Sequence, residues 1–157
     1  MFKIILVFLI LSISIISCSI EEVPRLDESG TSLEGKPEME IDVSSPTFGV
    51  VQILRVSGAK IEVVGETKQD FFKTKGYVLK INGESFVDVF EYESSENLDA
   101  AANGISKDGM TINSIQAKWG STPHFYKTNR VIIEYIGDDK QILKLLENVS
   151  PQFAGGI

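Results

Sequence analysis

The chain has 157 residues, a formal net charge of −7, one cysteine and one histidine. These counts exclude an intrachain disulfide and a multi-histidine zinc site built from one chain. The acidic balance, and the lack of a basic patch interleaved with aromatic residues, argue against nucleic acid as a partner. Because the sequence also lacks a glycine-rich phosphate loop and a nucleophile elbow, we expect no metal, no cofactor and no enzymatic activity.

The first 17 residues are typical of a signal peptide. Lys3 supplies a positive start, and residues 4–16 are apolar except for two serines. A stable membrane-spanning helix needs about 20 apolar residues, so this stretch is short for a permanent anchor. The sequence therefore predicts a signal peptide over residues 1–17.

The signal ends in Ile15-Ile16-Ser17-Cys18, which contains the only cysteine of the chain. An aliphatic residue, a variable position, a small residue and a cysteine resemble the lipobox of bacterial lipoproteins, with Ile15 where leucine is usual. The resemblance implies that the Cys18 thiol is diacylated and becomes the first residue of the mature chain. Two acyl chains anchor a protein stably to a membrane. An ordinary cleaved signal and an uncleaved anchor are the alternatives.

Residues 18–46 differ sharply in composition from the rest of the chain. After Cys18 this segment has eight acidic and two basic residues, three of the five prolines and no aromatic residue. Such a composition buries too little apolar surface to offset the entropy lost on ordering. We therefore expect a lipidated cysteine followed by an acidic, flexible tether that holds a domain away from the membrane.

Residues 47–157 are enough to form one globular domain with a single core, and we expect this domain to be monomeric. Asn82-Gly83 separates two apolar runs and predicts a β-hairpin, because Asn and Gly best tolerate the positive φ angles of a type I′ turn. Residues 57–59 and 127–129 are predicted to close two further hairpins. Strands are predicted where β-branched and aromatic residues gather, at 47–56, 60–64, 76–81, 85–92, 111–119 and 131–136.

Two helices follow from apolar spacing at i, i+3, i+4 and i+7. The first begins at a cap from Ser94 or Ser95 and ends near Gly104; the second begins at Asp138 or Asp139 and ends before Pro151. Strands outnumber helices, and the hairpin makes neighbouring strands antiparallel. The predicted fold class is α+β, with a largely antiparallel β-sheet covered on one face by two α-helices.

The most suggestive segment for binding is 119–127, which reads WGSTPHFYK. Trp119, His124 and Tyr126, with Arg130 beyond the predicted turn, combine contact area with polar groups, as binding sites do. The alternative is that Trp119 and Tyr126 complete the core and that His124 is a satisfied polar residue at a strand start. A hydrolase that uses His124 with a carboxylate is a third and weaker hypothesis.

Patterning over residues 76–156, including 131–139 and the C-terminal 151–156, resembles that of a group of small secreted or lipid-anchored bacterial proteins. The resemblance implies a location and carries no activity. We therefore expect an envelope lipoprotein, lipid-anchored with its domain outside the cytoplasm. That domain would bind a small molecule, a glycan or a protein partner without catalysis. A structural or inhibitory interaction module of the envelope is the alternative function.

Overall fold

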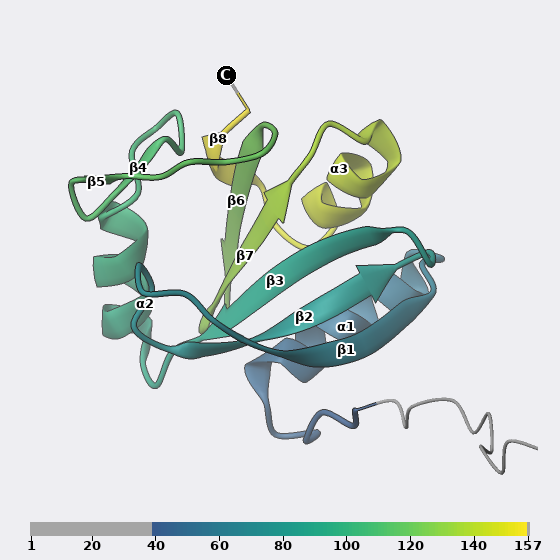
Figure 1. Cartoon of the computed structure of the whole chain (residues 1–157). Coiled ribbons are helices and arrows are strands. Elements are labelled where there is room, and N and C mark those ends of the chain that lie inside the picture. The colour runs from purple at the N-terminus through teal and green to yellow at the C-terminus, as the bar shows by residue number, and fades with distance from the viewer. Residues whose placement is uncertain (1–38, 157) are drawn as a thin grey trace, which may run out of the picture. The chain divides into compact units, whose positions relative to one another are not determined.

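A computed structural model describes residues 39–156 of the chain. The predicted signal peptide, Cys18 and the greater part of the predicted tether therefore lie outside the described residues. The described part is an α+β domain with one large antiparallel sheet, one small two-stranded sheet and three helices, which confirms the predicted fold class (Figure 1). In chain order the elements are α1 (Pro46–Val56), β1 (Ile61–Lys68), β2 (Lys75–Ile81), β3 (Ser85–Glu91), α2 (Ser95–Asn103), β4 (Thr111–Ile112), β5 (Ile115–Gln116), β6 (Pro123–Thr128), β7 (Val131–Ile136), α3 (Lys140–Glu147) and β8 (Gln152–Gly155).

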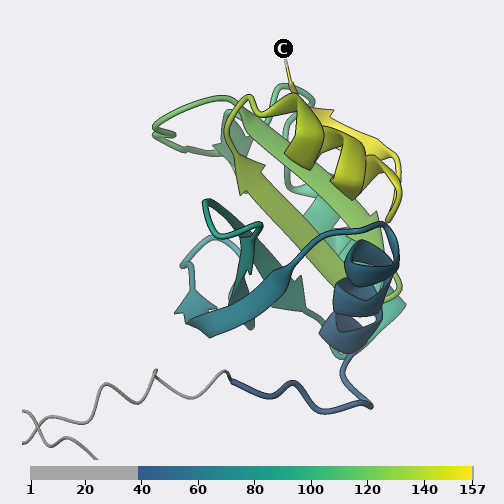
Figure 2. The same ribbon diagram turned by 90° about the vertical axis from the view of Figure 1, so that its right-hand side faces the viewer.

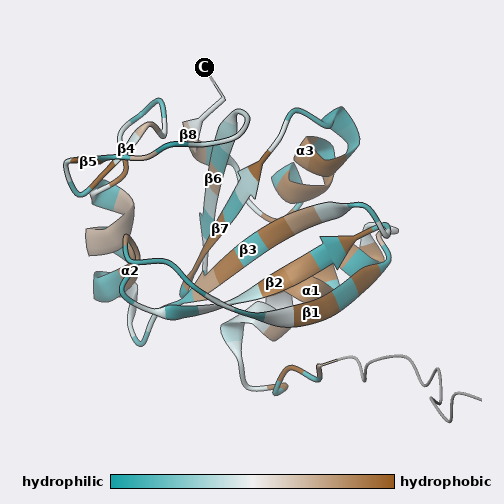
Figure 3. Cartoon of the chain, in the orientation of Figure 1, coloured by the Kyte–Doolittle hydropathy of each residue, from teal (hydrophilic) through white to brown (hydrophobic). Residues whose placement is uncertain are grey.

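The large sheet has the order β1-β2-β3-β7-β6-β8, and every neighbouring pair is antiparallel. The predicted hairpin between β2 and β3 is confirmed, since Asn82 and Gly83 lie at its turn with φ angles of 53° and 81°. Figure 3 shows hydrophobic and hydrophilic residues following one another at the start of β1, an edge strand, where every second residue is buried. In β7 five successive residues are buried, and because successive side chains point to opposite faces, this strand contributes to a core on each face of the sheet.

The prediction of a strand at 47–56 is wrong, because this segment forms helix α1. Ser45 caps the helix by accepting a hydrogen bond from the Thr47 amide, and Pro46 occupies the first turn, where its missing amide hydrogen has no cost. Val50 and Leu54 lie one turn apart and are buried against the sheet. Consequently residues 57–59 join a helix to a strand instead of closing a hairpin, and a domain start at residue 47 would remove the cap.

Two hydrophobic clusters lie on opposite faces of the sheet. Helices α1 and α3 cover one face, as both views show, and pack on alternate residues of β1, β2, β3 and β7 (Figures 1 and 2). Helix α2 lies on the other face, where Leu98 and Ala102 pack near Phe90, Phe125 and Ile132. Two helices on one face were expected and are found. However, the pair is α1 and α3, whereas the predicted pair, α2 and α3, is divided between the two faces.

The predicted strand at 111–119 is interrupted. Asn113 and Ser114 have φ angles of 50° and 65°, and these left-handed residues turn the chain between the short strands β4 and β5. The chain then continues through Trp119 to β6, beside which β8 adds a strand that was not predicted. None of the helices in residues 39–156 combines the length and the apolar character that a membrane span requires.

Candidate functional site

His124 and Tyr126, two of the predicted binding residues, lie on the α3 side of the sheet and share one partner. The His124 ring nitrogen Nδ1 is 2.9 Å from Gln152 Oε1, and the Tyr126 hydroxyl donates to the same oxygen at 3.3 Å. An amide oxygen only accepts, so Nδ1 carries the hydrogen. Tyr126 is completely buried, and this burial raises the pKa of its hydroxyl to about 12. These contacts join β6 to β8 in the interior.

Trp119 and Arg130 are not near this pair. Trp119 lies on the α2 side, where its indole nitrogen donates to the Gly109 carbonyl at 2.8 Å and its ring packs edge-on against Phe125. Arg130 lies in the turn between β6 and β7 and donates to the Glu93 carbonyl at 3.0 Å. The four predicted residues therefore do not form one surface. Within residues 39–156 the hydrogen-bond partner of the His124 ring is the Gln152 amide, and the hydrolase stays a hypothesis.

The α2 side carries a pair of carboxylates that the sequence analysis did not single out. Asp88 on β3 and Glu134 on β7 are directly opposed in the antiparallel register. One amide nitrogen, Gln69 Nε2, donates to both: to Asp88 Oδ2 at 3.1 Å and to Glu134 Oε1 at 2.9 Å. Glu134 is only 4% exposed, and its second oxygen, Oε2, has no hydrogen-bond partner within residues 39–156.

Burial controls the ionisation of this pair. It raises the pKa of Glu134 to about 7; the Gln69 hydrogen bond opposes the shift, and the nearby charge of Asp88 adds to it. Burial also raises the pKa of Asp88, against the lowering effect of Gln69. Desolvation and a like charge both disfavour a second negative charge at this position. Burial therefore disfavours the charged form of both carboxyl groups, and of Glu134 most.

Gln69 begins the connection between β1 and β2, residues 69–74, which we call the 69–74 loop. Its centre is tied to the α2 side because the Asn113 side-chain amide donates to the Phe71 carbonyl at 3.1 Å. Its far end is tied to β3 because the Thr74 hydroxyl donates to the Glu91 carbonyl at 2.6 Å. Its start is tied to the carboxylate pair through the Gln69 side chain. Thus the loop is bonded to this face of the sheet at its start, centre and end.

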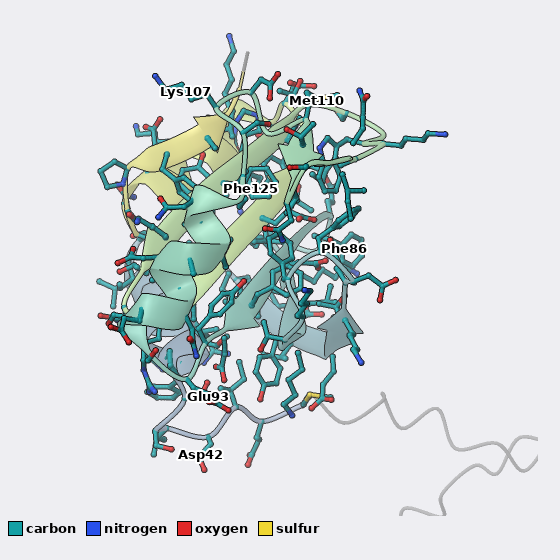
Figure 4. All side chains as sticks on the ribbon, turned by 90° about the vertical axis from the view of Figure 1, so that its left-hand side faces the viewer. Asp42, Phe86, Glu93, Lys107, Met110 and Phe125 are labelled. Carbon is teal, nitrogen blue, oxygen red and sulfur yellow. The ribbon has the colours of Figure 1, made fainter. Side chains whose placement is uncertain are left out.

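A cavity of about 410 Å³ lies between the 69–74 loop and α2; we call it the α2 cavity. Figure 4 looks at this side of the domain, with Glu93 near the start of α2 and Phe125 on the sheet beside the helix. The volume falls within the range of about 300 to 1,000 Å³ that is usual for small-molecule sites. Aromatic, amide and charged side chains line it, with small residues from the helix: Phe71, Phe72, Tyr92, Asn97, Asn113, Lys73, Glu93, Thr74, Ala100 and Ala101.

Tyr92 lines the α2 cavity and has a hydroxyl without a hydrogen-bond partner among residues 39–156. Its side chain is 8% exposed and lines the cavity, and its hydroxyl is buried with no hydrogen-bond partner in the described part of the chain. Burial raises the pKa of this hydroxyl well above its usual value, so it is neutral. A buried hydroxyl without a partner is unfavourable by about 1 to 3 kcal/mol. A ligand that bonds to it would remove that cost.

A second hollow of about 410 Å³ lies where the residues preceding α1 meet β1. Its walls include Phe48, Val51 and Val63, with Arg55 as a polar group. The Arg55 guanidinium donates to the Ile61 carbonyl at 3.2 Å, so this cation is already used within the fold. The α2 cavity is the better candidate because Tyr92, which lines it, has a buried hydroxyl without a partner among residues 39–156.

The signal for the carboxylate pair was present in the sequence. Glu134 interrupts the apolar run 131–136, and Asp88 interrupts the run 85–90. An acidic residue inside a buried strand is rare unless it is paired. No group of three potential metal-ligating side chains occurs among residues 39–156. None of the protein-family models, curated protein sequences and solved structures compared with the chain matches it.

Proposed function

We propose that the protein is a bacterial envelope lipoprotein, anchored through diacylated Cys18, whose domain binds a small molecule in the α2 cavity without catalysis. The observation that carries the binding proposal is the buried, unpartnered hydroxyl of Tyr92 in a cavity of suitable size. The anchor is supported by Ile15-Ile16-Ser17-Cys18 and by the acidic, aromatic-free segment after it. A tethered domain can sample solutes near a membrane surface.

The lining of the α2 cavity defines the chemistry of its ligand. The rings of Phe71 and Phe72 offer an apolar wall, and the amides of Asn97 and Asn113 stand with the Tyr92 hydroxyl as neutral hydrogen-bonding groups. Lys73 and Glu93, one charge of each sign, also line the cavity, so a complementary ligand needs no net charge and has one apolar face and several hydroxyl or amide groups. Sugar units of envelope glycans have this character, since their C–H face stacks on aromatic rings while their hydroxyls bond to amides.

The absence of catalysis is supported by where the ionisable pair lies. Asp88 and Glu134 do not line the α2 cavity, and Glu134 is almost fully enclosed. A general acid must reach the reacting atom within hydrogen-bond distance, directly or through one water. The pair is instead bonded to Gln69 and fastens the 69–74 loop.

Native mass spectrometry of the full chain, released from detergent after incubation with soluble muropeptides and their constituent sugars, tests the proposal. Ala100→Phe should fill the cavity and abolish the adduct, because Ala100 lines the cavity from the exposed side of α2. Asn103→Phe is the matched control, since Asn103 is an exposed residue on the same helix that does not line the cavity. An adduct that survives Ala100→Phe unchanged would contradict binding in the α2 cavity. A protein partner captured equally by both variants would favour the interaction module.

A further inference from the structure

Asp88 and Glu134 share one donor group. Each carboxylate accepts from Gln69 Nε2, which has two hydrogens and therefore can give one to each. Neither carboxylate takes part in an ion pair with the lysines and arginines of residues 39–156. Two anions side by side, with one neutral amide between them, are unfavourable in a desolvated setting.

Glu134 Oε2 is a buried oxygen that lacks a hydrogen-bond partner within residues 39–156. Only 4% of Glu134 is exposed, and this oxygen has no partner in the described part of the chain. A proton on Glu134 removes its charge, and a neutral carboxyl group is less costly to bury without a partner than a carboxylate is. We propose that Glu134 is protonated while the 69–74 loop is closed and that loss of this proton opens the loop at Gln69.

Among the described residues, no charged group that faces the pair is a cation in contact with it, so a proton is the species that can neutralise one of the two carboxylates. On β3 the facing group is Asp88 itself, and on β6 the residue opposite Glu134 is Phe125, which has no charge. The 69–74 loop contributes Gln69, while its charged residues Asp70 and Lys73 are exposed. On the remaining neighbours, Lys118 is exposed and Lys80 of β2 lies over the Phe86 ring at 5.8 Å.

Opening of the loop at Gln69 follows from how it is bonded. Gln69 bonds to the pair through its side chain, and its carbonyl accepts from the Phe72 amide at 3.2 Å, so the turn and the carboxylates are linked through one residue. When both carboxyl groups are ionised, Glu134 becomes more stable if water reaches it. The residue that must move to admit water is Gln69, and Phe71, two residues further on, moves against its bond to Asn113. This consequence for the α2 cavity rests on the proposed function, whereas the loop motion itself does not.

Trp119 reports the loop position without a ligand, because it is the only tryptophan and its ring centroid lies 6.2 Å from that of Phe71. The test is the Trp119 emission maximum of the full chain in neutral detergent from pH 5 to pH 8.5, with amide hydrogen exchange of residues 69–74 at both ends of the range. The expected result is one reversible red shift with its midpoint near pH 7, accompanied by faster exchange at Phe72 and unchanged exchange in β7.

Three variants make the result decisive. Glu134→Gln should abolish the transition, and Asp88→Asn should move its midpoint to lower pH because a like charge is removed. Glu66→Gln, an exposed strand glutamate paired with Lys75, should leave it unchanged. A wild-type protein without a transition, a transition that persists in Glu134→Gln, or a midpoint insensitive to Asp88→Asn would overturn the proposal. A midpoint that moves on addition of Ca²⁺ or EDTA would also overturn it, in favour of a bound cation.

Discussion

Replacing Glu134 by glutamine should change how the free energy of unfolding depends on pH. Folding raises the pKa of this buried acid from 4.5 to about 7, so between these values the folded chain binds more protons than the unfolded chain. The unfolding free energy of the wild type therefore falls as pH rises through this window. Each pKa unit corresponds to about 1.4 kcal/mol, which gives a loss of at most about 3.4 kcal/mol. Opening of the 69–74 loop would hydrate the carboxylate and reduce the loss.

Urea denaturation of the full wild-type chain and of Glu134→Gln, at pH values from 4 to 8, measures this difference. Several exposed carboxyl groups, among them Asp108 and Asp138, have lowered pKa values and so lose stabilisation at acid pH. Subtracting the two curves removes their contribution, because both proteins contain them. The difference should be constant below about pH 4.5 and should grow in favour of Glu134→Gln up to about pH 7. A difference that stays constant across this range, or grows in favour of the wild type, would refute the reasoning.

Three further predictions use single substitutions. Cys18→Ala should abolish metabolic labelling of the protein with a radioactive fatty acid, because only the thiol accepts the diacylglycerol; label retained by the variant would exclude the lipoprotein assignment. Leu146→Asp should reduce the free energy of unfolding by about 3 kcal/mol or more, since this side chain is completely buried, whereas exposed Lys144→Ala should change it by less than about 0.5 kcal/mol; equal shifts in denaturant melts would place α3 on the wrong face. Tyr92→Phe should raise the melting temperature of the ligand-free protein, by removing an unpartnered hydroxyl, and should weaken the native-mass-spectrometry adduct; a destabilised variant would show that the hydroxyl is bonded.

The elements that the sequence predicted well are those whose signals are local. Asn82-Gly83 defines its hairpin through two positive φ angles, and the caps Ser94 and Asp139 begin α2 and α3 where expected. Helix α1 was misassigned because its many β-branched residues favour a strand when they are considered alone. The Ser45-Pro46 start and the burial of its apolar residues on one face determine the outcome instead, and that burial depends on a sheet formed later in the chain.

The candidate site was harder to predict because it depends on strand order. Asp88 and Glu134 are distant in sequence and meet only because β3 pairs with β7. Conversely, His124 and Trp119 are close in sequence but face opposite sides of the sheet, since alternation along β6 and the path of residues 117–122 separate them. A sequence pattern can indicate that Glu134 is an unusual buried acid. It cannot indicate that Gln69 lies between it and Asp88.

The most direct test of the central claim is a two-dimensional ¹H–¹⁵N NMR titration of the full chain with a muropeptide sugar that forms an adduct. The account predicts that amide shift changes concentrate at residues 71–74, Tyr92, Asn97 and Asn113, which surround the α2 cavity. Changes centred on His124 and Gln152, on the opposite side of the sheet, would contradict it and would return the binding role to the segment that the sequence first suggested.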